Sequence, residues 1–152
     1  MIPRLATDCK GVDELLAGGI EQGTVTLVYG EAGSGKTSLA LQLSREAIKT
    51  SSDSVVLFVD TEGLSVERMG QIFGDVDQDR LLLIRPSSLD DLHQTLTKKL
   101  EQHDKISLIV VDTINAYVRL SYIKNKERSE RQFLEMTSIL QPLAEKGDFP
   151  VF

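Results

Sequence analysis

Short apolar runs alternate along the chain with longer segments in which apolar residues recur at helical spacing. The apolar runs are nearly continuous, as expected for strands that are buried on both faces of a sheet. The predicted strands cover residues 24–29, 55–60, 80–85 and 107–112. The predicted helices cover residues 12–16, 36–50, 65–73, 88–102 and 128–146. This alternation predicts an α/β fold with a mainly parallel sheet covered by helices on both faces.

Capping and helix-breaking residues refine the bounds of these elements. Ser88, followed by an acid at Asp91, is expected to cap the N-terminus of its helix. Pro142 lies inside the last helical pattern, and because proline lacks a backbone N–H we expect it to kink or end that helix. A further strand pattern starts at residues 149–152 and stops with them. We therefore expect a single, partial domain over residues 1–152 that ends inside a strand.

Composition limits the class of protein. The chain has 152 residues, of which 41% are apolar and 26% are charged, as is typical of globular proteins. Its apolar runs are too short to cross a bilayer, and its first residues lack the apolar core of a signal peptide. Cys9 is the single cysteine, so no disulfide can form within one chain. We expect a cytoplasmic protein with no membrane partner.

The charge distribution is uneven. A net charge of −6 argues against a generally cationic nucleic-acid binder. Residues 119–131 nevertheless hold five basic and two acidic residues, and five minus two leaves a local charge of +3. A local basic site and the solvated start of a charge-mixed helix would both produce this pattern.

One loop carries a specific chemical signature. Residues 30–37 read GEAGSGKT and match the phosphate-binding pattern G-x-x-x-x-G-K-[ST] between a predicted strand and a predicted helix. In this pattern backbone N–H groups bind the α- and β-phosphates, the lysine reaches the β- and γ-phosphates, and the last hydroxyl binds Mg²⁺. An ordinary glycine-rich turn is the alternative. The predicted nucleotide contacts are Gly30, Glu31, Ala32, Gly33, Ser34, Gly35, Lys36, Thr37 and Ser38.

Two acids follow predicted strands and suit the chemistry of a bound nucleotide. Asp112 ends the run LIVVD, where a second ligand for Mg²⁺ beside Thr37 is expected, although an aspartate there could also cap a helix. Glu62 follows the strand of residues 55–60, at the edge where open α/β sheets bind ligands. Glu62 is the candidate to orient a water toward the γ-phosphate, and a polar turn is the alternative.

Four segments together resemble a known family. They are TDCKGVDELLAGGIEQG (residues 7–23), GEAGSGKT (30–37), FVDTEGLSVERM (58–69) and LIVVDTINAYVRL (108–120). These segments are similar to the ATPase core of the RecA/RadA-family recombinases. The resemblance implies a RecA-like P-loop NTPase core with its last strands missing. It also implies that Glu62 is the catalytic glutamate and that Asp112 is the aspartate of the second nucleotide motif. Lys36 of the loop is expected to take part in catalysis by stabilising the transferred charge.

The resemblance further implies partners. The segment after AYVR would face DNA, single-stranded or double-stranded, and its candidate contacts are Arg119, Lys124, Lys126 and Arg128. Recombinase or repair proteins and further copies of the chain are the other expected partners. The expected activity is weak, DNA-dependent hydrolysis of ATP with Mg²⁺, in recombination and repair. Alternatives are an ATP-gated mediator that binds DNA or protein without useful catalysis, a KaiC-like ATPase, and a small-molecule kinase.

Overall fold

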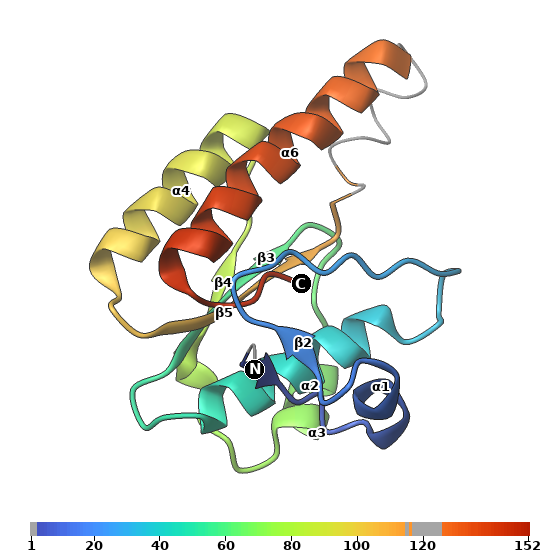
Figure 1. Cartoon of the computed structure of the whole chain (residues 1–152), viewed down its shortest axis with the longest axis vertical. Helices are drawn as coiled ribbons and strands as arrows, with labels where there is room; N and C mark the ends of the chain where they lie inside the picture. Colours follow the sequence, from blue (N-terminus) through green and yellow to red (C-terminus); the bar gives the residue numbers. More distant parts are fainter. Residues whose placement is uncertain (1–2, 115, 117–125) are drawn as a thin grey trace.

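A three-stranded parallel sheet forms the centre of the computed structural model, which describes residues 3–114, 116 and 126–152. The strands are β3 (Val55–Asp60), β4 (Leu81–Ile84) and β5 (Ile106–Asp112), and β3 lies in the middle (Figure 1). Val59 of β3 is in register with Ile84 of β4 and Val111 of β5. The three predicted strands are therefore confirmed, and their carboxyl ends share one edge of the sheet.

Helices cover both faces of this sheet, as predicted. Helices α2 (Lys36–Lys49) and α3 (Val66–Phe73) pack on one face. Helices α4 (Leu89–Gln102) and α6 (Lys126–Gly147) lie on the other and run beside each other in Figure 1. Alternate residues of β3 supply the two cores: Val56 and Phe58 face α2, whereas Leu57 and Val59 face α4 and α6. All four side chains are fully buried, which explains the continuous apolar run in the sequence.

An N-terminal hairpin lies beside this core. Strands β1 (Arg4–Leu5) and β2 (Ile20–Glu21) pair antiparallel and are joined by helix α1 (Lys10–Leu15), which buries none of its residues. Gly19 has a φ of +126°, and a Cβ at this position would lie 2.0 Å from the carbonyl oxygen of Leu5. The close approach of the two backbones therefore requires glycine here.

The predicted strand over residues 24–29 is largely wrong. Only Val25 forms a β-bridge, and its partner is Val151, which also bridges to Ile109. The Val151 N–H donates to Thr24 O at 2.9 Å and the Thr26 N–H donates to Val151 O at 2.8 Å. Residues 149–152 therefore lie between the chain at residues 24–26 and β5. Pairing stops at Thr26, because a strand exists only where a neighbour accepts and donates its backbone hydrogen bonds.

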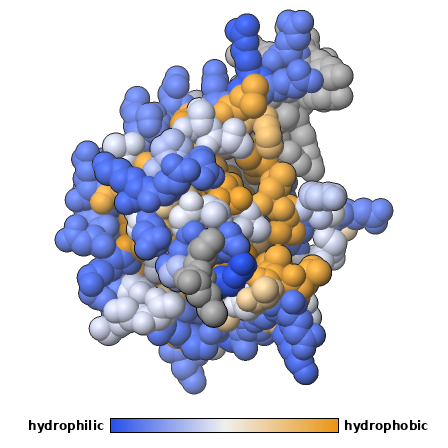
Figure 2. All heavy atoms as spheres, viewed as in Figure 1, coloured by the Kyte–Doolittle hydropathy of each residue, from blue (hydrophilic) through white to orange (hydrophobic). Residues whose placement is uncertain are grey.

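The residues that follow are apolar and exposed. Leu27 is 58% exposed, Val28 39% and Tyr29 89%. Figure 2 shows apolar side chains gathered in a band on the face in view, in the region where α6 and the end of the chain lie in Figure 1. The β-branched pattern of residues 24–29 favours a strand, but only the first residues of this segment pair with a neighbour.

Helix ends follow the predicted signals in one case and not in another. The Ser88 hydroxyl accepts a hydrogen bond from the Asp91 N–H at 3.1 Å, so the predicted cap of α4 is confirmed. Pro142 does not end α6, which continues to Gly147. Met136, Leu140 and Ala144 are all buried against the sheet, and this packing on both sides of the exposed proline holds the helix together.

Among the described residues, no helix combines the length and the apolar character needed to cross a membrane.

Candidate functional site

The glycine-rich loop connects the bridge at Val25 to helix α2. Gly33 and Gly35 have φ angles of +78° and +93°, a left-handed conformation that glycine adopts without strain. Gly35 is also the N-cap of α2, so the unpaired N–H groups of the first helical turn open onto the loop. A helix N-terminus of this kind favours a bound anion, and phosphate above all.

Lys36 lies across the loop. Its Nζ donates hydrogen bonds to the carbonyl oxygens of Gly30 at 2.8 Å and Glu31 at 2.7 Å, and to Ser34 Oγ at 3.4 Å. The ammonium group is therefore held at the loop rather than extended into solvent. Its positive charge adds to that of the helix N-terminus.

Thr37 and Asp112 meet although they are far apart in the sequence. Thr37 is in the first turn of α2, and Asp112 is the last residue of β5. The Thr37 hydroxyl donates to Asp112 Oδ2 at 2.7 Å. The structure therefore brings together the two oxygen groups that the sequence suggests as metal ligands, and carboxylate and hydroxyl oxygens are donors that suit Mg²⁺.

A cleft of about 590 Å³ lies above these residues. It is lined by most of the predicted nucleotide contacts, by Asp112 and by Glu62. The predicted residues that line it are Gly30, Ala32, Gly33, Gly35, Lys36, Thr37, Ser38, Glu62 and Asp112. A carboxylate, a cation, a helix N-terminus and a pair of oxygen ligands thus share one cavity.

Glu62 stands on a turn that is fixed to the neighbouring strand. The Thr61 N–H donates to Asp112 O at 3.0 Å. Thr61 Oγ1 accepts from the Thr113 N–H at 2.8 Å and donates to Thr113 O at 3.1 Å. These three bonds join the turn after β3 to the turn after β5, so the residue before Glu62 cannot move independently of the residue after Asp112.

The Asp60 side chain stabilises the same turn by accepting hydrogen bonds from its backbone. This side chain is 4% exposed, and its two oxygens accept the backbone N–H groups of Gly63 at 2.8 Å and Leu64 at 2.9 Å. Burial alone would raise the pKa of Asp60. Hydrogen bonds from Leu64, Gly63 and Arg85, with the charge of Arg85, outweigh burial and hold this pKa below its usual value. Asp60 is therefore a buried carboxylate that stays ionised.

Arg68 is a residue of the cleft to which the sequence assigned no role. It comes from α3, lines the cleft, and its Nη2 donates to Ser38 Oγ at 3.2 Å. The only signal in the sequence was its place in the ERM triplet of the motif of residues 58–69. Helical spacing alone could not show that this arginine reaches across to α2.

Comparison with known proteins identifies the family. The sequence model of the Rad51 family matches residues 1–152, which is the whole chain. The chain belongs to the Rad51 family. This membership confirms the predicted resemblance to the RecA/RadA group, and it favours the recombinase branch over a KaiC-like ATPase.

Named relatives of this Rad51-family chain support the same placement. It is 37% identical to the DNA repair and recombination protein RadB of Methanococcoides burtonii, over 97% of the chain and 68% of that relative. Identity is 33% to RadB of Thermoplasma acidophilum, over 99% of the chain and 66% of the relative. Identity is 34% to RadB of Archaeoglobus fulgidus, over 97% of the chain and 67% of that relative. The Rad51-family chain thus spans about two thirds of the length of these relatives.

The predicted DNA contacts of the Rad51-family chain fall largely outside the described residues. Arg119 and Lys124 lie outside them altogether. Lys126 and Arg128 are in the first turn of α6, where the structure describes the backbone and not these side chains. The DNA-binding role of this segment stays a prediction.

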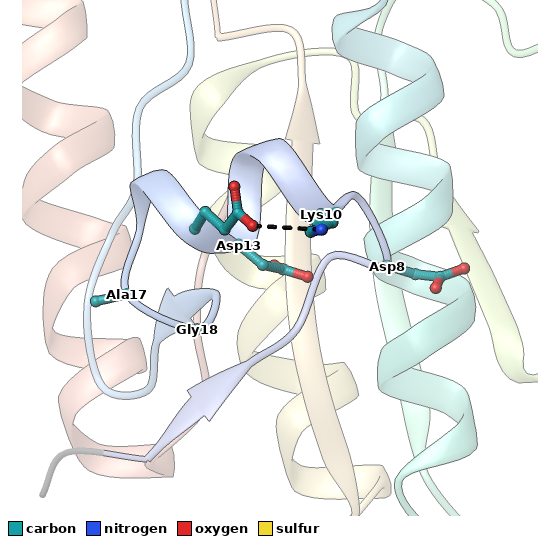
Figure 3. Close-up of a pocket in the computed structure, with 6 residues that line it drawn as sticks. Asp8, Lys10, Asp13, Ala17 and Gly18 are labelled. Carbon is teal, nitrogen blue, oxygen red and sulfur yellow. Dashed lines mark ion pairs between the residues drawn. The ribbon is translucent and has the colours of Figure 1, made fainter.

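A second hollow, of about 630 Å³, lies against α1 of the Rad51-family chain. Figure 3 shows its lining residues Asp8, Lys10, Asp13, Ala17 and Gly18. Asp13 Oδ1 accepts the Thr7 N–H at 2.8 Å, and Lys10 pairs with Glu14 at 3.8 Å. The Asp8 carboxylate points away from α1 (Figure 3). It pairs with Arg45 of α2. Asp13 thus fixes the start of the hairpin, Asp8 joins the hairpin to α2, and Glu14 pairs within α1, so we do not treat the hollow as a candidate site.

Proposed function

We propose that this chain is the ATP-binding core of a recombination and repair protein and that it hydrolyses ATP slowly. The observation that carries the proposal is the shared cleft, in which Lys36, Thr37, Asp112 and Glu62 all line one cavity beside a helix N-terminus. Membership of a nucleotide-binding ATPase family supports the choice of ATP. The printed function of the RadB relatives, DNA repair and recombination, supports the biological role.

In this proposal the loop binds the phosphates. The backbone N–H groups of residues 33–37 donate to phosphate oxygens, and Lys36 balances their negative charge. Because Lys36 Nζ is already bonded to Gly30 O and Glu31 O, the ammonium is positioned before the nucleotide arrives. Pre-positioned charge of this kind stabilises the transferring phosphoryl group without reorganisation at the moment of reaction.

Thr37 and Asp112 would hold Mg²⁺. Their donor set, one hydroxyl and one carboxylate oxygen in contact, fits a cation that completes its shell with water and phosphate oxygens. When bound, the metal would neutralise negative charge on the β- and γ-phosphates. The Thr37 hydroxyl could keep donating to Asp112 while a lone pair of its oxygen would bind the metal, because donation uses the hydrogen and metal binding uses the oxygen.

Glu62 would orient the attacking water. A carboxylate in this role accepts a hydrogen bond from the water and fixes its direction toward the γ-phosphate. Arg119, Lys124, Lys126 and Arg128 would contact DNA and link its presence to turnover.

Turnover measurements on three proteins test the proposal. We expect the wild type to hydrolyse ATP above a Lys36→Ala blank, with a rate that rises with single-stranded DNA. Glu62→Gln should lower kcat at least 100-fold and leave ATP affinity within about twofold, because it removes the water-orienting charge and not a phosphate contact. Wild-type turnover equal to the blank, with ATP still bound, would replace the enzyme with a nucleotide-gated binding module.

A further inference from the structure

The turn that carries Glu62 is closed by one buried carboxylate. Asp60 accepts the backbone N–H groups of Gly63 and Leu64, the two residues that follow Glu62. Gly63 has a φ of +91°, so the backbone reverses direction at this point. The position of Glu62 along the turn is therefore set by the position of the Asp60 carboxylate.

Arg85 sets the position of that carboxylate in turn. Arg85 directly follows β4, the strand that pairs with β3. Its Nε lies 3.0 Å and its Nη2 2.9 Å from Asp60 Oδ2, the same oxygen that accepts the Leu64 N–H. Two charged N–H groups on one oxygen hold the carboxylate more firmly than neutral donors do. The arginine side chain is 64% exposed, so its removal leaves no large cavity.

The two sides of Glu62 are thus fixed by different strands. Thr61, before it, is bonded to Asp112 and Thr113 at the end of β5. Gly63, after it, is bonded to Asp60, which is held by Arg85 beside β4. Glu62 therefore lies at the midpoint of a span that reaches from one outer strand of the sheet to the other.

We propose that Asp60 and Arg85 are positioning residues for Glu62, and that their ion pair fixes the turn from which Glu62 orients the attacking water. The inference rests on the proposed function, in which Glu62 has that role. A shift of about 1 Å in a group that orients a reactant can cost about 100-fold in rate. An exposed arginine that never touches the nucleotide can therefore affect kcat.

The first test separates kcat from ATP binding. Arg85→Ala should lower kcat about tenfold or more and leave the Kd for ATP within about twofold, because the phosphate loop is untouched. Arg85→Lys should recover part of the rate, since a lysine keeps the charge and one donor. Lys105→Ala is the matched control: this lysine is also 64% exposed and pairs with Asp53 at 3.8 Å. Wild-type kcat in Arg85→Ala, or an equal loss in Lys105→Ala, would overturn the inference.

A second variant asks whether Arg85 acts through Glu62. In a Glu62→Gln background, adding Arg85→Ala should lower the residual rate by less than twofold, because the group that the pair positions has already lost its charge. The same tenfold loss in both backgrounds would show that Arg85 acts elsewhere and would overturn the inference.

Amide hydrogen exchange decides the positioning independently of turnover. The Gly63 and Leu64 amides should exchange at least fivefold faster in Arg85→Ala than in the wild type, whereas the Asp91 amide, bonded to Ser88 Oγ, should not change. Unchanged exchange at Gly63 and Leu64 would overturn the inference. If the wild type fails to hydrolyse ATP above the Lys36→Ala blank, the proposed function falls, and the exchange result still decides whether the ion pair fixes the turn.

Discussion

At the scale of single residues, the site depends on carboxylates whose partners come from other elements. Asp112 accepts the hydroxyl of Thr37, and Asp60 accepts two backbone N–H groups and Arg85. A buried carboxylate without such partners is costly, because burial removes the water that would stabilise its charge. Loss of one partner therefore affects stability as well as geometry.

The lowered pKa of Asp60 makes stability depend on pH. A carboxyl group whose pKa is lower in the folded state contributes stability above its unfolded pKa of about 4, and this contribution is lost as pH falls through the folded value. Asp60→Asn should lower the free energy of unfolding at pH 7 by about 1–3 kcal/mol. The gap to the wild type should narrow below about pH 4.

Urea unfolding of both proteins at pH 7, 5, 4 and 3 measures this gap. Asp104→Asn removes an exposed carboxylate from a turn and controls for the change in net charge. A gap that stays constant from pH 7 to pH 3 would contradict the assigned cause.

At the scale of elements, helix α2 is anchored at both ends. Its N-terminus opens onto the phosphate loop, and its last turn is held by Arg80, the last residue of the 3-10 helix η1 (Gln78–Arg80). Arg80 Nη1 donates to Ile48 O at 3.0 Å and Ser51 O at 2.8 Å. A cation at a helix C-terminus satisfies carbonyls that lack helical partners and interacts favourably with the helix dipole.

Arg80→Ala should therefore destabilise the fold without changing the affinity for ATP. We expect a loss of about 1–3 kcal/mol in the free energy of unfolding, because carbonyls at the end of α2 lose a charged donor. ATP affinity should stay within about twofold, since the loop lies at the other end of the helix. Thermal unfolding and ATP titration measure the two effects, with Lys105→Ala as control. A weaker ATP affinity without a loss of stability would refute this division.

At the scale of the whole molecule, an acidic chain must meet a polyanion if it binds DNA. The net charge of −6 opposes the approach of DNA, whereas residues 119–131 carry a local excess of +3. DNA affinity should therefore depend on this segment and on salt. The double variant Arg119→Ala/Lys124→Ala should weaken DNA binding and lower the slope of log Kd against log salt by about 1–2, as expected for two lost phosphate contacts.

Fluorescence anisotropy with a labelled single strand at several salt concentrations measures this slope. Lys98→Ala/Lys105→Ala removes the same charge from elsewhere on the chain. Equal slopes in the two double variants would mean that binding follows net charge and that the segment has no special role.

The sequence predicted most of the fold because most elements carry their own pattern. The run of residues 55–60 is apolar throughout, and this reflects burial on both faces. Residues 24–29 show a similar pattern, yet only Val25 is bridged, because pairing depends on where residues 149–152 lie. Pro142 does not end α6, because the buried Met136 and Ala144 hold the helix together across it.

Sequence motifs predicted some residues of the candidate site and missed others. The phosphate loop, Asp112 and Glu62 could be found because they belong to contiguous motifs. Contacts between elements could not be found in this way. Arg68 contacts Ser38, and Arg85 contacts Asp60, and the residues of each pair are too far apart in the sequence for a helix or strand pattern to relate them. Motifs therefore suggest candidate reacting groups, whereas the residues that contact them from other elements appear only when the strands are assembled.

The bridge between Val25 and Val151 has a consequence for folding during synthesis on the ribosome. The segment leading into the phosphate loop leaves the ribosome well before its pairing partner, which follows it by 126 residues (151 minus 25). Until Val151 emerges, this segment lacks the two backbone hydrogen bonds that tie it to the sheet. Closing so long a loop is also entropically slow. A nascent chain should therefore complete the pairing that leads into this loop only after Val151 has emerged.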